Sequence, residues 1–227
     1  MLIKDTMPFV RDLMMNNNRE WFQANKPRWE SVKKSFLEYT QICIDEMVKL
    51  DPSLGTPKPS QCMYRIYRDV RFSNDKRPYK AHVSFFIATG GVKRTGVPGY
   101  YVQFAPEEED GCFMGGGIFM PDGPALSAIR QEIFYNTEEF LSIINDEEYK
   151  RWFPGGFWDP WPLKSAPKGY DKNWEHIKLL NHRNYCCMHE VKEDLVNSKD
   201  LVDYTLECFR ASLKLNQFIQ KAMYELI

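Results

Sequence analysis

The sequence predicts an α+β fold, in which helices pack against one face of an antiparallel sheet. Two observations on periodicity support this. Apolar residues in the first and last thirds recur in helical steps, whereas apolar and polar residues alternate in the middle, as they do in half-buried strands. A third observation is that the strand-like segments are joined by short connections. These favour antiparallel pairing, because parallel strands need a long crossover. We expect a meander of about four strands, and a further strand later in the chain.

Composition sets the class of protein. The chain has 227 residues, of which 43% are hydrophobic and 15% aromatic, so it can bury a sizeable core and is not disordered. We expect a single domain over residues 1–227, with helices in 1–50, a central sheet in 60–120 and a helical half in 124–227. Pro and Gly residues in 51–60 form a linker, but we do not expect it to separate two domains.

Charge and targeting signals narrow the partners. A formal net charge of −1 argues against a general nucleic-acid binder, so nucleic acid is not the favoured partner. No apolar run approaches the roughly 18 residues of a membrane span, and charges with a proline interrupt the first apolar stretch, unlike a secretory signal. These features predict a cytoplasmic protein without a membrane partner.

Two helices are expected near the N-terminus. Asn17 has the chemistry of an N-cap, with Glu20 reaching back from three residues later to complete a capping box. Pro27 suits the first turn of a longer helix, which ends at Asp51 and Pro52. The apolar stripe of that helix recurs in steps of three and four residues: Trp29, Val32, Phe36, Tyr39, Cys43, Met47 and Leu50.

The strand and helix segments of the rest follow from the same patterns. Strands are expected near 62–67, 82–89, 99–105 and 112–120, and a further one near 184–191. Gly123 and Pro124 begin the helical half, whereas the Pro- and Trp-rich stretch at 152–162 is incompatible with regular structure.

The most informative stretch is the basic segment, residues 65–80, which reads RIYRDVRFSNDKRPYK. It has six cationic side chains against two acidic ones, in a chain of otherwise balanced charge. Arginine offers a planar fork that fits carboxylate or phosphate, so the segment predicts a site for a small anionic ligand. The proposed anion-binding residues are Arg65, Arg68, Arg71, Lys76 and Lys80.

Three functions are compatible with the basic segment. The first is an enzyme that acts on a small phosphorylated or carboxylated substrate, with Asp69 or a tyrosine as the candidate for proton transfer. The second is a non-catalytic module that binds nucleic acid or a phosphorylated partner. The third is a purely structural Arg–Asp network. The sequence identifies neither a reaction nor a cofactor.

Three consecutive glycines, Gly115, Gly116 and Gly117, suggest a bulge or the close approach of a ligand or another backbone. Neither a P-loop nor a dinucleotide-binding fingerprint surrounds them, and close packing under a helix is the favoured explanation. As pocket backbone, they would lie beside a depression on which at least two of the three arginines converge with Lys76 or Lys80.

Metal binding is not expected. His182, Cys186, Cys187 and His189 resemble a cluster, but adjacent cysteines in a strand face opposite ways and the zinc-site spacing of cysteines is absent. The six cysteines are spaced irregularly, which predicts reduced core thiols.

Five stretches together resemble a known family. They are residues 17–22 (NNREWF), the basic segment, 98–101 (PGYY), the three glycines and 167–171 (PKGYD). In this order they are similar to the widespread uncharacterised family called domain of unknown function 2461. The resemblance covers most of the chain and implies a soluble single-domain protein. It implies no activity and no catalytic residues.

Overall fold

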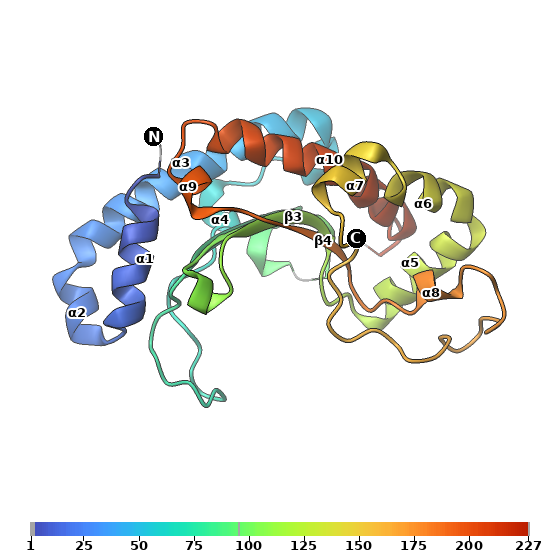
Figure 1. Cartoon of the computed structure of the whole chain (residues 1–227), viewed down its shortest axis with the longest axis horizontal. Coiled ribbons are helices and arrows are strands. Elements are labelled where there is room, and N and C mark those ends of the chain that lie inside the picture. The colour runs from blue at the N-terminus through green and yellow to red at the C-terminus, as the bar shows by residue number, and fades with distance from the viewer. Residues whose placement is uncertain (1–2, 95, 227) are drawn as a thin grey trace. The chain divides into compact units, whose positions relative to one another are not determined.

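The computed structural model describes residues 3–94 and 96–226. Its antiparallel sheet has four strands in the order β1-β2-β3-β4, which are Val83–Ile87, Gly99–Phe104, Phe113–Ile118 and Tyr185–Glu190 (Figure 1). Half of the chain is helical, so the α+β class is confirmed. The expected strands near 82–89, 99–105, 112–120 and 184–191 are present.

The strand expected near 62–67 is wrong. Residues Pro59–Cys62 form helix α4, and the segment that follows pairs through two isolated bridges, Met63–Phe85 to β1 and Tyr67–Tyr79 to the residues before it. The reason lies in the register. Tyr64 N–H donates to the carbonyl of Ser84, whereas Lys80 N–H donates to the carbonyl of Ile66. Between these two bonds, Arg65 alone faces the three residues 81–83. This bulge interrupts the ladder.

The chain divides into two compact units. Unit 1 comprises residues 1–93, 101–114 and 190–207, and unit 2 comprises 94–100, 115–189 and 208–227. The linker-like stretch 51–60 lies wholly inside unit 1. Whether the units form one domain, as the sequence predicts, stays a prediction.

Unit 1 is built around one long helix. Its helices are α1 Thr6–Met15, α2 Arg19–Ala24, α3 Lys26–Leu50, α4, α9 Glu193–Val196 and the start of α10 Leu201–Ala222, with 3₁₀ turns at Pro52–Leu54, Gly91–Lys93 and Glu107–Glu109. The predicted stripe of α3 faces the sheet, where the rings of Phe36 and Tyr39 lie 5.6–6.1 Å from those of Phe85 and Phe104. Only Leu50, at the end of the stripe, is exposed (38%) instead of buried.

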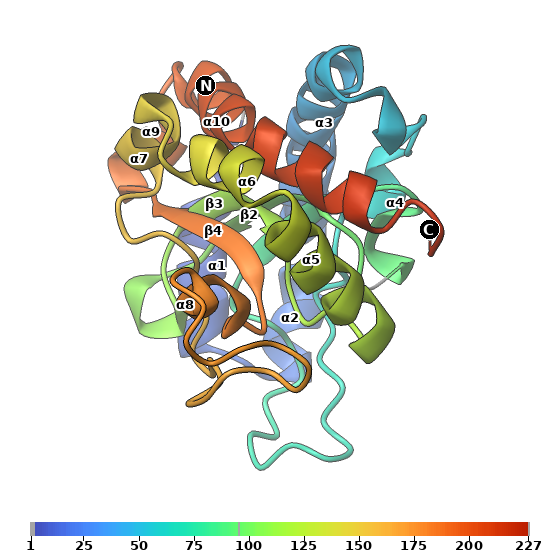
Figure 2. The ribbon, with the colours of Figure 1, turned by 90° about the vertical axis from the view of Figure 1, so that its right-hand side faces the viewer.

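Unit 2 has its own core. It contains α5 Gly123–Tyr135, α6 Thr137–Ile144, α7 Glu147–Trp152, α8 Ile177–Leu180 and the rest of α10 (Figure 2). Phe140 lies at the centre of an aromatic cluster with Phe157, Tyr185 and Phe218. Beyond the end of α7 at Trp152, the stretch up to residue 162 is irregular, as expected.

One finding bears on membranes. Among the helices in the described ranges, none combines the length and the apolar character that crossing a bilayer requires.

Candidate functional site

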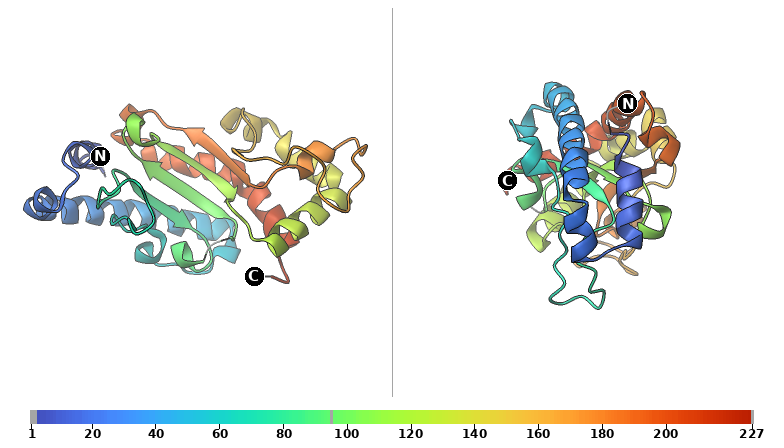
Figure 3. Two further views of the ribbon diagram at one scale, coloured as in Figure 1. Left: turned by 90° about the horizontal axis from the view of Figure 1, so that it is seen from below. Right: turned by 90° about the vertical axis from the view of Figure 1, so that its left-hand side faces the viewer.

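The basic segment forms most of a long irregular hairpin in unit 1. Residues 63–67 and 79–85 run antiparallel through the bridges Met63–Phe85 and Tyr67–Tyr79, and the stretch between them projects away from the sheet (Figures 1 and 3). We call residues 63–85 the basic hairpin, residues 69–77 its tip, and residues 63–67 and 79–82 its base. Arg68 and Pro78 join the tip to the base.

The base is clamped to the N-terminal helices. The side-chain amide of Asn17 donates to the carbonyl of Tyr79 (3.0 Å) and accepts from its N–H (3.1 Å). The ring of Phe22 on α2 stacks on Tyr79 at 4.0 Å between centroids and meets Tyr67 edge-on at 6.0 Å. The capping-box pattern predicted Asn17 as the N-cap of α2, and this prediction is wrong. Asn18 is the N-cap and accepts from Trp21 N–H at 2.9 Å.

At the tip, arginines and carboxylates neutralise one another. Arg77 donates to Asp75 through Nε (2.9 Å) and Nη2 (2.7 Å), and to Glu109. Arg68 Nη1 donates to the same carboxylate, at 2.5 Å from Asp75 Oδ2. Hydrogen bonds from Arg77 and then Arg68 hold the pKa of Asp75 well below its usual range. The tip therefore carries much of the Arg–Asp network that the structural interpretation expected.

Arg71 and Lys76 also find partners within the tip. Arg71 holds Asp69 with two side-chain hydrogen bonds, at 3.0 and 2.6 Å, and Lys76 Nζ donates to the carbonyl of Val70 at 3.0 Å. Phe72 is 96% exposed, with the Arg71 guanidinium 5.7 Å from its ring centre. Hydrogen bonding by Arg71 lowers the pKa of Asp69 to about 2. Asp69 is thus a carboxylate at neutral pH and a weak proton acceptor.

The base differs, because its cations lie next to one another. Lys80 is half-buried, and burial, followed by the nearby charges of Arg65 and Arg68, lowers its pKa. Burial, followed by Lys80 and Arg68, lowers the pKa of His82 to about 4, so His82 is neutral at pH 7. Within residues 3–94 and 96–226, no ion pair to a carboxylate involves Arg65 or Lys80. We call Arg65, Arg68, Lys80 and His82 the base cluster.

Aromatic rings continue from the base cluster across the sheet. Lys80 Nζ lies 5.1 Å from the ring centre of Tyr64, which meets Tyr101 at 6.2 Å, and Tyr101 meets Phe113 at 5.4 Å. Because side chains alternate along a strand, Tyr101 points away from the face on which Val102 and Phe104 are buried. The view from below shows β1 in front of α3 (Figure 3). Helix α3 therefore covers the face of the sheet with Val102 and Phe104, and Tyr101 belongs to the other face.

The candidates from the sequence therefore separate. Arg65, Arg68 and Lys80 are brought together, whereas Arg71, Lys76 and Asp69 lie at the tip with partners of their own. Their convergence on a single depression stays a prediction. Sequence reasoning did not place His82, Tyr64 or Tyr101 at the site. For Tyr101, the available signal was its alternation with the apolar residues Tyr100 and Val102.

The three glycines allow close backbone packing in unit 2. A Cβ at Gly115 would lie 1.9 Å from the carbonyl oxygen of Cys187, and one at Gly116 would lie 2.3 Å from Ser212 Oγ. Gly117 has φ +109° and donates its N–H to the Asn216 side chain at 2.8 Å. These contacts explain why glycine is needed at these positions. The placement of Gly115, Gly116 and Gly117 beside the basic segment stays a prediction, because the two belong to different units.

The histidines and cysteines of β4 and its approach have separate partners. His182 Nδ1 lies 3.3 Å from Asp159 and His189 Nδ1 lies 2.7 Å from the carbonyl oxygen of Trp152, while Cys186 and Cys187 donate to different backbone carbonyls. Burial raises the pKa of both thiols to about 12. In the part of the chain that the structure describes, no three His, Cys, Asp or Glu side chains are grouped closely enough to hold a metal ion.

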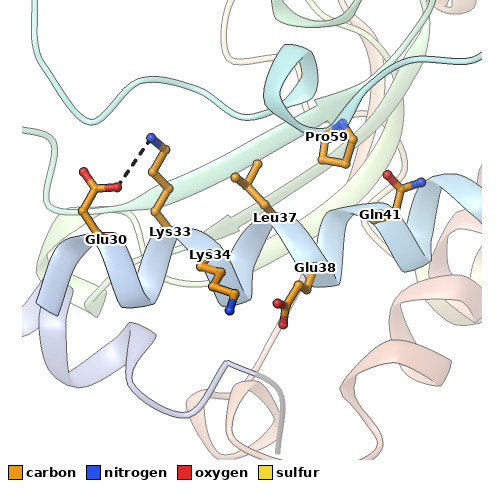
Figure 4. Close-up of a pocket in the computed structure, with 7 residues that line it drawn as sticks. All are labelled: Glu30, Lys33, Lys34, Leu37, Glu38, Gln41 and Pro59. Atoms are coloured by element: carbon orange, nitrogen blue, oxygen red, sulfur yellow. Dashed lines mark ion pairs between the residues drawn. The ribbon is translucent and has the colours of Figure 1, made fainter. Parts of the chain in front are cut away.

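A shallow groove on α3 is a weaker candidate. It encloses about 390 Å³ and is lined by Glu30, Lys33, Lys34, Leu37, Glu38, Gln41 and Pro59 (Figure 4). Lys33 lies 3.8 Å from Glu30, and Lys34 points away from Lys33. Because charges of both signs alternate along the helix, the groove presents no convergent set of one sign.

Comparison with known proteins gives one result. A family model described as conserved hypothetical protein (DUF2461) matches residues 5–218. This range includes Asn17 and Phe22, which clamp the base, as well as the basic hairpin and the three glycines. No curated protein and no solved structure matches the chain. Since the family model spans nearly the whole sequence, the chain belongs to the DUF2461 family of conserved hypothetical proteins.

Proposed function

We propose that the protein binds a small phosphorylated or carboxylated ligand at the base of the basic hairpin. The observation that carries this is Lys80, a half-buried ammonium with cationic neighbours and no carboxylate partner among the described residues. Burying a charge without a partner is costly, and like charges nearby add to the cost. A bound anion would relieve both.

Each member of the base cluster has a role in this proposal. Arg65 supplies a guanidinium fork for two oxygens of the ligand, and Lys80 supplies a point charge beside it. Arg68 is shared, because Asp75 holds its Nη1 on the tip side. The Phe22–Tyr79 stack and the Asn17 clamp keep the backbone of the base still. This rigidity lowers the entropic cost of ordering the site around a ligand.

The extension to catalysis rests on His82. Burial is the main cause of the low pKa of His82, and the charges of Lys80 and then Arg68 lower it further. An anion beside Lys80 would offset the charge contribution and raise this pKa. His82 would then be a better proton acceptor than in the unliganded protein. Asp69 is a poorer choice than the sequence suggested, because the hydrogen bonds from Arg71 lower its pKa to about 2 and make it a weak proton acceptor.

A second candidate function concerns the tip. Phe72 is an exposed aromatic ring on a projecting loop, with the guanidinium of Arg71 beside it. Such a surface suits a macromolecular partner, as in the non-catalytic alternative. The base remains the preferred site, because the cations of the tip are already paired.

Thermal melts test the proposal. Phosphate, sulfate, nucleotides and dicarboxylates are added at matched ionic strength, and a specific ligand at a hundred times its Kd raises stability by about 2.7 kcal/mol. Arg65→Lys should weaken that effect while the variant still folds, because an ammonium cannot make the bidentate contact. Arg71→Lys, at the tip, is the matched control and should leave the effect unchanged.

Two results would overturn the proposal. One is a parent protein whose melting temperature no anion raises beyond the sodium chloride control. The other is an Arg65→Lys variant that melts far below the parent, since Arg65 would then be a structural residue.

A further inference from the structure

We infer that the anion bound at the base carries an aromatic or similarly planar body, which lies along Tyr64, Tyr101 and Phe113. This inference rests on the proposed function and names the class of its ligand. The anionic group would meet Arg65 and Lys80, and the ring would lie on the aromatic row beside them.

The base cluster and the aromatic rings are continuous. Lys80 Nζ lies over the Tyr64 ring, the Tyr64 and Tyr101 rings are in contact, and so are those of Tyr101 and Phe113. Cation and rings thus form one uninterrupted surface within unit 1. A ligand that is held at Lys80 and extends along this row would contact aromatic carbon throughout.

The three rings of the row are partly exposed. Tyr64, Tyr101 and Phe113 are each only half-buried, whereas Val102, Phe104 and Met114, which alternate with them on β2 and β3, are fully buried. An inorganic ion would need only the cations. Partly open rings beside an anion site fit a ligand that has apolar surface as well as charge.

The central ring of the row, Tyr101, is held in place. Tyr101 Oη donates to Gln103 Oε1 at 2.9 Å. Gln103 is buried. A fixed aromatic surface loses little entropy when a second ring stacks on it.

The alternative is that the row only packs against itself. Its rings meet at 68° and 32°, geometries that are favourable without any ligand. The experiment below makes this alternative one of its outcomes.

Isothermal titration calorimetry with matched pairs of anions is the test. Phenyl phosphate is compared with methyl phosphate, and benzoate with acetate, so that the charged group is constant within each pair. The comparison between pairs shows whether the site takes phosphate or carboxylate. We expect the aromatic member of the preferred pair to bind about tenfold more tightly.

Variants assign the preference to the row. Tyr101→Leu should abolish the aromatic preference while methyl phosphate or acetate binds as before. Tyr135→Leu, which replaces an exposed tyrosine on α5, is the matched control and should change neither. If Tyr101→Leu does not fold, Phe113→Leu replaces it.

The outcomes separate the two proposals. If both members of a pair bind equally, the aromatic row has no role in binding, and this inference fails while the anion site stands. If no anion binds at all, the proposed function fails and this inference fails with it.

Discussion

The tip and the base of the basic hairpin come from one charge-rich stretch, yet they treat charge in opposite ways. At the tip, Asp69 and Asp75, together with Glu109 from the turn Glu107–Glu109, accept hydrogen bonds from the arginines of the tip. At the base, Arg65 and Lys80 lie near each other and, among the described residues, form no ion pair with a carboxylate, although the charge of Arg65 contributes to the lowered pKa of Asp69. A run of cations in a sequence is therefore not one feature. Where its counter-ions lie decides which part can accept a ligand.

Burial differs between the two regions in the same direction. Phe72 at the tip is 96% exposed, whereas Phe22, which packs on the base, is 1% exposed. The base is therefore bound to the core of unit 1, and the tip is braced chiefly by its own hydrogen bonds. Loss of packing at the base should therefore cost more stability than loss of packing at the tip, and changes at the tip should leave anion binding unaffected.

The largest expected effect is on packing. Phe22→Ala removes a buried ring that stacks on Tyr79 and contacts Trp29, and should reduce the free energy of unfolding by roughly 3–5 kcal/mol. Phe72→Ala is the matched change at the tip and should stay within about 0.5 kcal/mol of the parent. Chemical denaturation measures both. Equal losses in the two variants would mean that tip and base are not mechanically distinct.

The next effect depends on pH and on His82. Its pKa is lowered from 6.5 to about 4 in the folded protein, so the unfolded chain binds this proton first. Stability should therefore fall as the pH drops from about 6.5 to 4, by up to about 3 kcal/mol. His82→Asn should flatten this part of the curve.

The difference between parent and variant is the quantity to use, because burial also lowers the pKa of His182. Phosphate should raise the pKa of His82 in NMR titrations if it binds at the base. An unchanged pKa in saturating phosphate would place any bound anion elsewhere.

A smaller effect concerns the sign of a charge deletion. Lys80→Met removes a half-buried cation from among other cations and should stabilise the protein by about 1 kcal/mol. Arg77→Met leaves Asp75 without its main partner and Glu109 without a guanidinium, and should destabilise by a similar amount of about 1 kcal/mol. Melting temperatures of the two variants should move in opposite directions. A shift of the same sign in both would remove the electrostatic basis of the comparison.

The smallest effect is expected for Arg71. Its side chain is 75% exposed and that of its partner Asp69 is 42% exposed, so Arg71→Gln should change stability by no more than about 0.5 kcal/mol. Anion affinity at the base should be unchanged too. A marked loss of affinity in this variant would return Arg71 to the binding site, where the sequence had placed it.

Local patterns in the sequence were sufficient for much of the fold. The step of three and four residues from Trp29 to Met47 predicted α3, and alternation predicted β2. The segment at 62–67 failed because its irregularity originates elsewhere. The bulge at 81–83 belongs to the opposing segment, and nothing in residues 62–67 encodes it.

The site was predictable in its charge but not in its pairing. The excess of cations in 65–80 could be counted directly. The second partner of Arg77 could not be inferred, because Glu109 lies 32 positions away. Asn17 was assigned to the nearest helix for the same reason, whereas its partner Tyr79 is 62 positions distant. Propensity rules weigh neighbours in the chain, and both of these contacts depend on tertiary structure.

The Asn17 clamp has a consequence for the chemical ageing of the protein. Its amide acts as a one-residue substitute for a neighbouring strand, since it both donates to Tyr79 and accepts from it. Deamidation would turn that side chain into an aspartate, which accepts but cannot donate. The Tyr79 carbonyl would lose its donor and face a carboxylate instead. A single spontaneous reaction at the N-terminal helices would thus loosen the base of the hairpin, without any change in the basic segment itself.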